Sequence, residues 1–185
     1  MGFFLSAGVH SISTLFRMEI DLMRSLRVSL PAGLLFLAGC AGAPAAAPSA
    51  PSAADVAAAE AVIDSLLSVA MEGASTAKAD QVMSIAQGAP DFTFLTGDIL
   101  VSGFEPTREA FARTYASIKG QHQNLLEKKI RLLTPDVAVL MAASEGAYID
   151  SSGTVSEPVG MGLTIVFVRR DGRWVAEHAH QSIIK

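Results

Sequence analysis

Residues 125–185 have the sequence LLEKKIRLLTPDVAVLMAASEGAYIDSSGTVSEPVGMGLTIVFVRRDGRWVAEHAHQSIIK, which carries the clearest pattern in the chain. Four long apolar runs alternate with short segments rich in Pro, Asp, Ser and Gly. Runs bounded in this way are typical of β-strands, and turns this short join antiparallel neighbours. The pattern therefore predicts an antiparallel meander with strands at 125–133, 137–149, 159–170 and 173–184.

The residues before the meander show helical patterns. Apolar side chains recur every three or four positions over 56–72, which predicts a helix that Asp55 caps and Gly73 ends. A second, shorter helix is expected at 77–86.

A hairpin and a third helix are expected between these helices and the meander. The residues of 91–103 flank Thr96-Gly97-Asp98, a turn sequence typical of a β-hairpin. Pro106 then occupies a position that is common at the first turn of a helix, and the helix is expected to continue to Gly120.

Composition limits the possible classes of protein. The chain has 185 residues, half of them hydrophobic, and this favours one folded domain over a disordered polar chain. A net charge of −4 argues against a nucleic-acid-binding groove. The single cysteine, Cys40, excludes a disulfide scaffold.

Residues 23–39 have the features of a secretory signal. Arg24 and Arg27 precede an apolar run over 28–38, which is too short to span a bilayer as a helix. The run ends in Leu37-Ala38-Gly39-Cys40, which resembles the lipobox of bacterial lipoproteins. That resemblance implies lipidation of Cys40, a membrane anchor, and a place in the bacterial cell envelope facing the periplasm or the exterior. The alternative is an unmodified cysteine after an ordinary signal.

The remaining N-terminal residues divide into two parts. Residues 1–22 are either a gene-model extension or a long n-region, with Met1, Met18 and Met23 as the candidate starts. Residues 40–54 consist mainly of Ala, Pro, Ser and Gly, so they are expected to form a tether. The folded domain is then expected at 55–185.

The order of elements, together with the C-terminal motif, resembles a known superfamily. Arg169-Arg170-Asp171-Gly172-Arg173-Trp174 is followed by His178, His180 and Ser182, and Tyr148-Ile149-Asp150 precedes them. This is similar to the nuclear transport factor 2-like superfamily, in particular to SnoaL-like and ketosteroid-isomerase-like proteins and to the association domain of calcium/calmodulin-dependent kinases. The resemblance implies an α+β cone, in which a curved antiparallel sheet wraps the helices and leaves a pocket open at one end. It also implies a homodimer.

Alternation along the last strand places Trp174, His178 and His180 on one face of the sheet. Three interpretations remain open for the histidines: they close the sheet, they form a polar pocket wall, or they bind a metal. A metal site usually needs three or four protein ligands. We therefore expect neither a metal nor a cofactor.

Glu145 is the most notable carboxylate, because it lies in an otherwise small and apolar strand. Burial would raise its pKa towards a range useful for acid–base catalysis. The alternative is a surface carboxylate paired across the sheet. Glu145 and His178 are the weak catalytic candidates, and the residues expected to line the pocket are Phe92, Phe94, Tyr115, Glu145, Tyr148, Trp174, His178 and His180.

The sequence favours a lipid-anchored envelope domain that binds a small apolar or mixed ligand without covalent chemistry. One alternative is an enzyme of the SnoaL or ketosteroid-isomerase type, with Glu145 or His178 as proton carrier. Another is a purely structural dimerisation module. An open pocket that holds Glu145 and a histidine would favour the enzyme, and a closed, dry pocket would favour the structural module.

Overall fold

The computed structural model describes residues 50–184. The expected signal peptide at 23–39, the stretch 1–22, Cys40 and most of the 40–54 tether lie outside the described residues. Within the described part of the chain, every helix is too short or too polar to cross a bilayer.

The first helix, α1 (Ala53–Ser75), begins earlier than expected. Its N-cap is Ser52, whose hydroxyl oxygen accepts from the backbone N–H of Asp55, while the Asp55 carboxylate accepts from the Ser52 N–H. The expectation that Asp55 is the N-cap is therefore wrong. Asp55 is the third helical residue of a capping box, which satisfies two backbone donors at once.

Gly73 lies inside α1 and does not end it. A Cβ atom there would come within 2.7 Å of the backbone nitrogen of Val82, so the missing side chain allows α2 (Ala79–Met83) to pack closely. A short 3₁₀ turn, η2 (Ser84–Ala86), follows α2. The glycine thus serves helix packing rather than helix termination.

The expected hairpin is confirmed as β1 (Thr93–Thr96) and β2 (Ile99–Ser102), which pair antiparallel around Gly97. The third helix, α3 (Phe104–Tyr115), is shorter than predicted. The chain has already entered β3 (Ile118–Thr134) at Gly120, so the prediction of a helix up to Gly120 is wrong.

The predicted antiparallel meander is confirmed as β3, β4 (Val137–Asp150), β5 (Val159–Arg170) and β6 (Arg173–Ile184), but the predicted start of its first strand at Leu125 is wrong, because β3 already begins at Ile118. The strand order in the six-stranded sheet is β2-β1-β6-β5-β4-β3. The hairpin joins the meander through β1, which runs parallel to β6.

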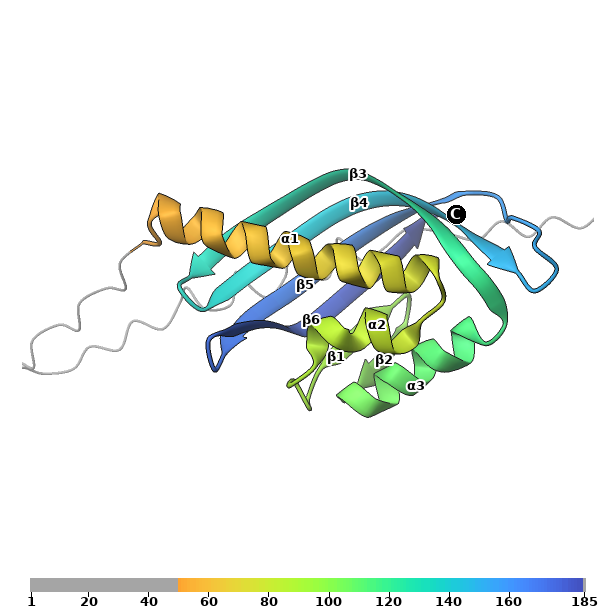
Figure 1. Cartoon of the computed structure of the whole chain (residues 1–185), viewed down its shortest axis with the longest axis horizontal. Helices are drawn as coiled ribbons and strands as arrows, with labels where there is room; N and C mark the ends of the chain where they lie inside the picture. The colour runs from red at the N-terminus through yellow and green to blue at the C-terminus, as the bar shows by residue number, and fades with distance from the viewer. Residues whose placement is uncertain (1–49, 185) are drawn as a thin grey trace, which may run out of the picture. The chain divides into compact units, whose positions relative to one another are not determined.

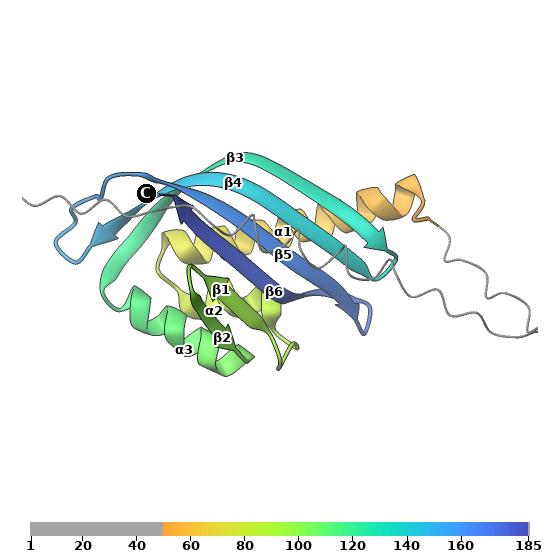
Figure 2. The same cartoon turned by 180° about the vertical axis from the view of Figure 1, so that it is seen from behind.

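All three helices lie on one face of the curved sheet, with α1 running across the meander (Figure 1). The opposite face carries no helix (Figure 2). The core forms between α1 and the sheet, where Ile63, Leu140 and Phe167 are fully buried. These layers constitute the expected α+β architecture.

A β-bulge in β6 changes which side chains face the helices. Phe167 lies opposite Ala176, but the next partner pair is Val166 and His178, so Glu177 is the extra residue. An extra residue in a strand reverses the alternation beyond it. The expectation that Trp174 shares a face with the histidines is therefore wrong.

Candidate functional site

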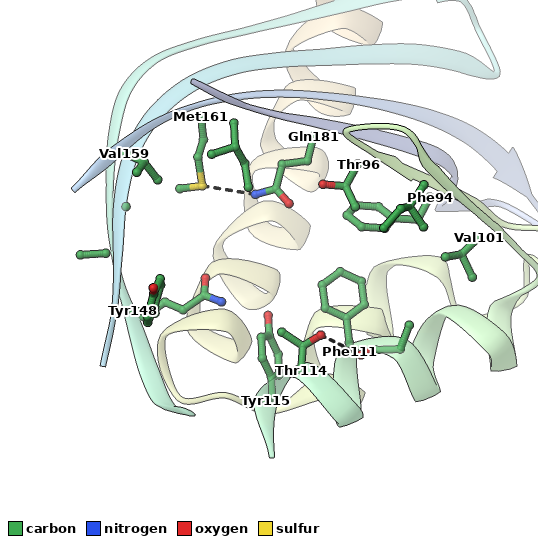
Figure 3. Close-up of a pocket in the computed structure, with 16 residues that line it drawn as sticks. Phe94, Thr96, Val101, Phe111, Thr114, Tyr115, Tyr148, Val159, Met161 and Gln181 are labelled. Carbon is green, nitrogen blue, oxygen red and sulfur yellow. Dashed lines mark hydrogen bonds between the residues drawn. The ribbon is translucent and has the colours of Figure 1, made fainter. Parts of the chain in front are cut away.

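A cavity of about 560 Å³ opens between the hairpin, α3 and one end of the meander (Figure 3). This end is formed by the first residues of β3 and β5 and the last residues of β4 and β6. Its size falls within the range of pockets that bind small molecules. Ile99, Tyr148 and Ile183 are half-exposed at its rim. The lining residues are Phe94, Thr96, Ile99, Val101, Ala110, Phe111, Thr114, Tyr115, Gln121, Gly146, Ala147, Tyr148, Val159, Met161, Gln181 and Ile183.

Three aromatic rings form one wall of the cavity. The centroids of Phe94 and Phe111 are 5.1 Å apart, and those of Phe111 and Tyr115 are 5.7 Å apart. Phe111 and Tyr115 are four residues apart on α3, so they project from the same side of this helix. Tilted rings at these separations attract one another and provide a firm apolar surface.

Two glutamines, Gln121 and Gln181, contribute amide groups to the lining. Gln123 Nε2 donates to Gln121 Oε1 at 2.9 Å, so the amide nitrogen of Gln121 keeps its hydrogens for another acceptor. Gln181 Nε2 contacts Met161 Sδ at 3.2 Å, which leaves the Gln181 amide oxygen as an acceptor. Neighbouring groups therefore fix the orientation of both amides.

The cavity continues inward as a smaller hollow of about 140 Å³. The two share a ring of side chains at their junction: Phe94, Phe111, Tyr115, Gln121 and Gln181. Residues of α1, including Leu67 and Ala70, line the inner end. The polar groups thus lie at the junction between an open outer chamber and an apolar inner one.

The lining is electrically neutral. The described residues around the outer cavity include no carboxylate, imidazole, amine, guanidinium or thiol. Burial raises the pKa of the Tyr115 hydroxyl to about 12, so this group remains protonated near neutral pH. The site can offer hydrogen bonds and apolar contact but no full charge.

The structure places four of the eight expected pocket residues around this space. Phe94, Tyr115 and Tyr148 line the outer cavity. Phe92, which is buried, lines the inner hollow.

The histidines lie on the helix-free face of the sheet. His178 Nδ1 is 2.7 Å from Thr93 Oγ1, which lies opposite it on β1, so the ring links two neighbouring strands. His180 lines a separate shallow hollow that includes Lys129. Beyond the bulge, it is Gln181 that faces the helices, and therefore neither histidine lines the cavity.

Trp174 is buried at the other end of the sheet, where the Arg169 guanidinium lies 4.9 Å from the centre of its ring. It lines a third hollow, together with residues of α1 and η2. It contributes to the core rather than to the cavity.

Glu145 is an exposed residue of β4 and lies outside the cavity lining. Its neighbour on β5 is Gly160, whereas Thr164 is the β5 neighbour of His180. Those neighbours are separated by about 13 Å along the strand. The Glu145 side chain is therefore exposed outside the cavity lining, although the next residue, Gly146, lines it, and Glu145 lies far from the histidine pair.

No group of three or more metal-ligating side chains occurs in residues 50–184.

Sequence reasoning missed Phe111, Gln121 and Gln181. The spacing of Phe111 and Tyr115 on α3 was a signal that could have identified the first. Gln121 directly follows the helix predicted to end at Gly120, but it belongs to β3. Simple alternation along the last strand would turn Gln181 away from the face of Trp174, because the bulge at Glu177 leaves no trace in the alternation of residue types.

Comparisons with known proteins identify the family and the fold of this chain. A SnoaL-like domain family model matches residues 61–185. No curated protein matches the chain. A solved structure from Xanthomonas campestris, named for a calcium/calmodulin-dependent protein kinase II association domain, is 25% identical and has a TM-score of 0.54, and the match covers 76% of this chain and 93% of that one.

Two more distant structures share the fold. A nuclear transport factor 2-like superfamily protein from Salmonella enterica is 13% identical, with a TM-score of 0.62 and coverage of 70% and 93%. A type 2 hexachlorocyclohexane dehydrochlorinase is 17% identical, with a TM-score of 0.63 and coverage of 72% and 90%. The family match and the shared architecture together establish that this chain belongs to the SnoaL-like domain family and has the nuclear transport factor 2-like fold.

Proposed function

We propose that this protein is a lipid-anchored envelope domain that binds a small, mainly apolar ligand in the cavity without covalent chemistry. The observation that carries the proposal is the neutral lining of a cavity of about 560 Å³, built mostly from aromatic and aliphatic side chains. Pockets of this kind retain ligands by apolar contact and use a few polar groups for orientation.

Several features favour binding over catalysis. Proton transfer needs an acid or a base within hydrogen-bond reach of the substrate. Glu145 and the histidines lie outside the cavity lining, and the high pKa of Tyr115 makes its hydroxyl a poor base at neutral pH. The dehydrochlorinase shares only the fold with this chain, and a fold alone does not carry an activity.

A purely structural role is less well supported, because the cavity is open at its rim.

The helix-free face of the sheet remains available for a homodimer, since Met141, Thr164 and Val166 are partly exposed there. We expect Thr164→Arg to convert a dimer to a monomer in sedimentation equilibrium. Ser68→Arg, on the exposed side of α1, is the control, and a dimer that survives Thr164→Arg would contradict this arrangement.

Native mass spectrometry of protein purified from its own host tests the binding proposal. Ala110 lines the cavity, so Ala110→Trp should fill it, whereas Ala112 is exposed on the same helix and Ala112→Trp should not. We expect a bound small-molecule mass in the wild type and in Ala112→Trp, and its loss in Ala110→Trp. The same bound mass in all three proteins would place the ligand elsewhere, and bare wild-type protein would contradict retention of a ligand.

A further inference from the structure

We infer that the junction between the two chambers is a recognition site for one neutral carbonyl group on an otherwise apolar ligand, read by Tyr115, Gln121 and Gln181. This inference rests on the proposed function and specifies the chemical class of the ligand. It follows from which hydrogen-bonding atoms at the junction are already occupied and which remain available.

The two donors come from adjacent elements. The hydroxyl of Tyr115, at the end of α3, points into the hollow (Figure 3), and none of the hydrogen bonds formed by the described residues engages it. Gln121, on β3, has its amide oxygen occupied by Gln123, so its amide nitrogen is the group left to donate. A ligand carbonyl oxygen has two lone pairs and can accept from both donors.

The acceptor lies across the hollow. The amide of Gln181 points towards the side that bears Tyr115 (Figure 3), and its nitrogen contacts the sulfur of Met161. Its oxygen can therefore accept from a hydroxyl or N–H group of the ligand. A carbonyl with a neighbouring donor group would satisfy all three side chains.

The rest of the lining limits the charge and the shape of the ligand. An anion would lose its hydration without meeting a cation, and a cation would meet no carboxylate. Phe94 and Phe111 offer ring surfaces beside the three polar groups, and these favour a flat or aromatic body. The site therefore selects neutral carbonyl compounds over acids, amines and plain hydrocarbons.

A series of three probes with matched shapes tests this selection by isothermal titration calorimetry. The probes are 2-acetylnaphthalene, 2-isopropylnaphthalene and 2-naphthoate, which carry a ketone, no oxygen and a carboxylate, respectively. We expect the ketone to bind at least about tenfold more tightly than the hydrocarbon, because a buried polar site left unpaired disfavours an analogue without the oxygen. The carboxylate should bind at least about tenfold more weakly than the ketone.

Single-residue variants assign the effect to the junction. Tyr115→Phe and Gln121→Leu should each weaken ketone binding by about three- to tenfold and leave hydrocarbon binding unchanged. Ser117→Ala is the control, because Ser117 is exposed outside the cavity lining and its hydroxyl donates to the carbonyl of Thr114, so ketone binding should not change. Thermal unfolding identifies any variant that fails to fold, and the wild-type probe series is decisive without the variants.

The possible outcomes separate this inference from the proposed function. Equal wild-type affinity for ketone and hydrocarbon would overturn the carbonyl site and leave the apolar pocket intact. Tightest binding of naphthoate would likewise overturn it. If none of the probes binds, the carbonyl site is overturned, and native mass spectrometry of the host-purified protein decides the ligand-binding function separately.

Discussion

Replacement of Trp174 by alanine is expected to remove about 3–5 kcal/mol from the free energy of unfolding. The side chain is only 7% exposed and belongs to the core cluster between α1 and the sheet. A buried tryptophan removes roughly 150–250 Å² from water, and at about 25 cal/mol per Å² this corresponds to about 4–6 kcal/mol of transfer free energy. Alanine retains part of that contact, so the expected loss of unfolding free energy is somewhat smaller than the full transfer free energy of the tryptophan side chain.

The contact with Arg169 adds a smaller contribution. The guanidinium lies 4.9 Å from the ring centre, at a site where such a contact contributes about 0.5–1 kcal/mol. Arg169→Met keeps the aliphatic part of the side chain and removes the cation, so it measures that contribution separately. We expect it to cost no more than about 1 kcal/mol.

Urea unfolding followed by far-ultraviolet circular dichroism measures both variants, since the alanine variant lacks the only tryptophan of the chain. For a domain of this size, the loss in Trp174→Ala should lower the melting temperature by roughly 10–20 °C. Small domains typically have only about 5–15 kcal/mol of stability, so the variant should lie close to unfolding. A loss below about 1 kcal/mol would refute the reasoning, because it would mean that the ring is solvated in the folded protein.

Three further predictions concern other parts of the chain. Gly120→Ala should destabilise the domain by about 1–3 kcal/mol in urea unfolding, because a Cβ there would clash with the carbonyl oxygen of Ser75. Gly162→Ala, which meets only a serine hydroxyl that can rotate away, should cost clearly less, and equal losses would argue against the α1–β3 contact. Cys40→Ser should release the protein from the membrane fraction, and membrane association that persists after detergent-free washing would exclude the lipid anchor. The domain should lose stability as the pH rises from about 10 to about 12, because the unfolded chain releases the Tyr115 proton at a lower pH than the folded chain does. Tyr115→Phe should reduce this alkaline loss of stability. Identical pH profiles of wild type and variant would mean that the Tyr115 hydroxyl is exposed to water in the folded protein.

Local sequence was sufficient to predict the meander. The boundaries of β5 and β6 were predicted to the residue, because Asp171-Gly172 forms a tight turn with both residues at positive φ. The N-terminus of α1 was less well placed, because Ser52 and Asp55 are both good cap residues. Only the reciprocal hydrogen bonds between them show which one is the cap.

The candidate site could be predicted only in part, because its residues come from strands and helices far apart in the chain. Aromatic side chains such as Phe94 and Tyr115 could be expected to line a cavity from their type alone. The exposure of Glu145 depends on which face of β4 the helices cover, and residue alternation divides a strand into two faces without saying which one is buried.

The sequence by itself therefore determined the strand runs and the existence of the helices, since periodicity and turn chemistry act over a few residues, while the α+β class followed from the resemblance to a known superfamily. The tertiary structure alone decided that β1 pairs in parallel with β6, that the bulge falls at Glu177 and that Gln181 faces the cavity. The physical reason is that one extra residue in a strand turns every later side chain to the other face. Packing against neighbouring strands and helices selects where that residue is accommodated, and the side chains of the last strand do not encode this position locally.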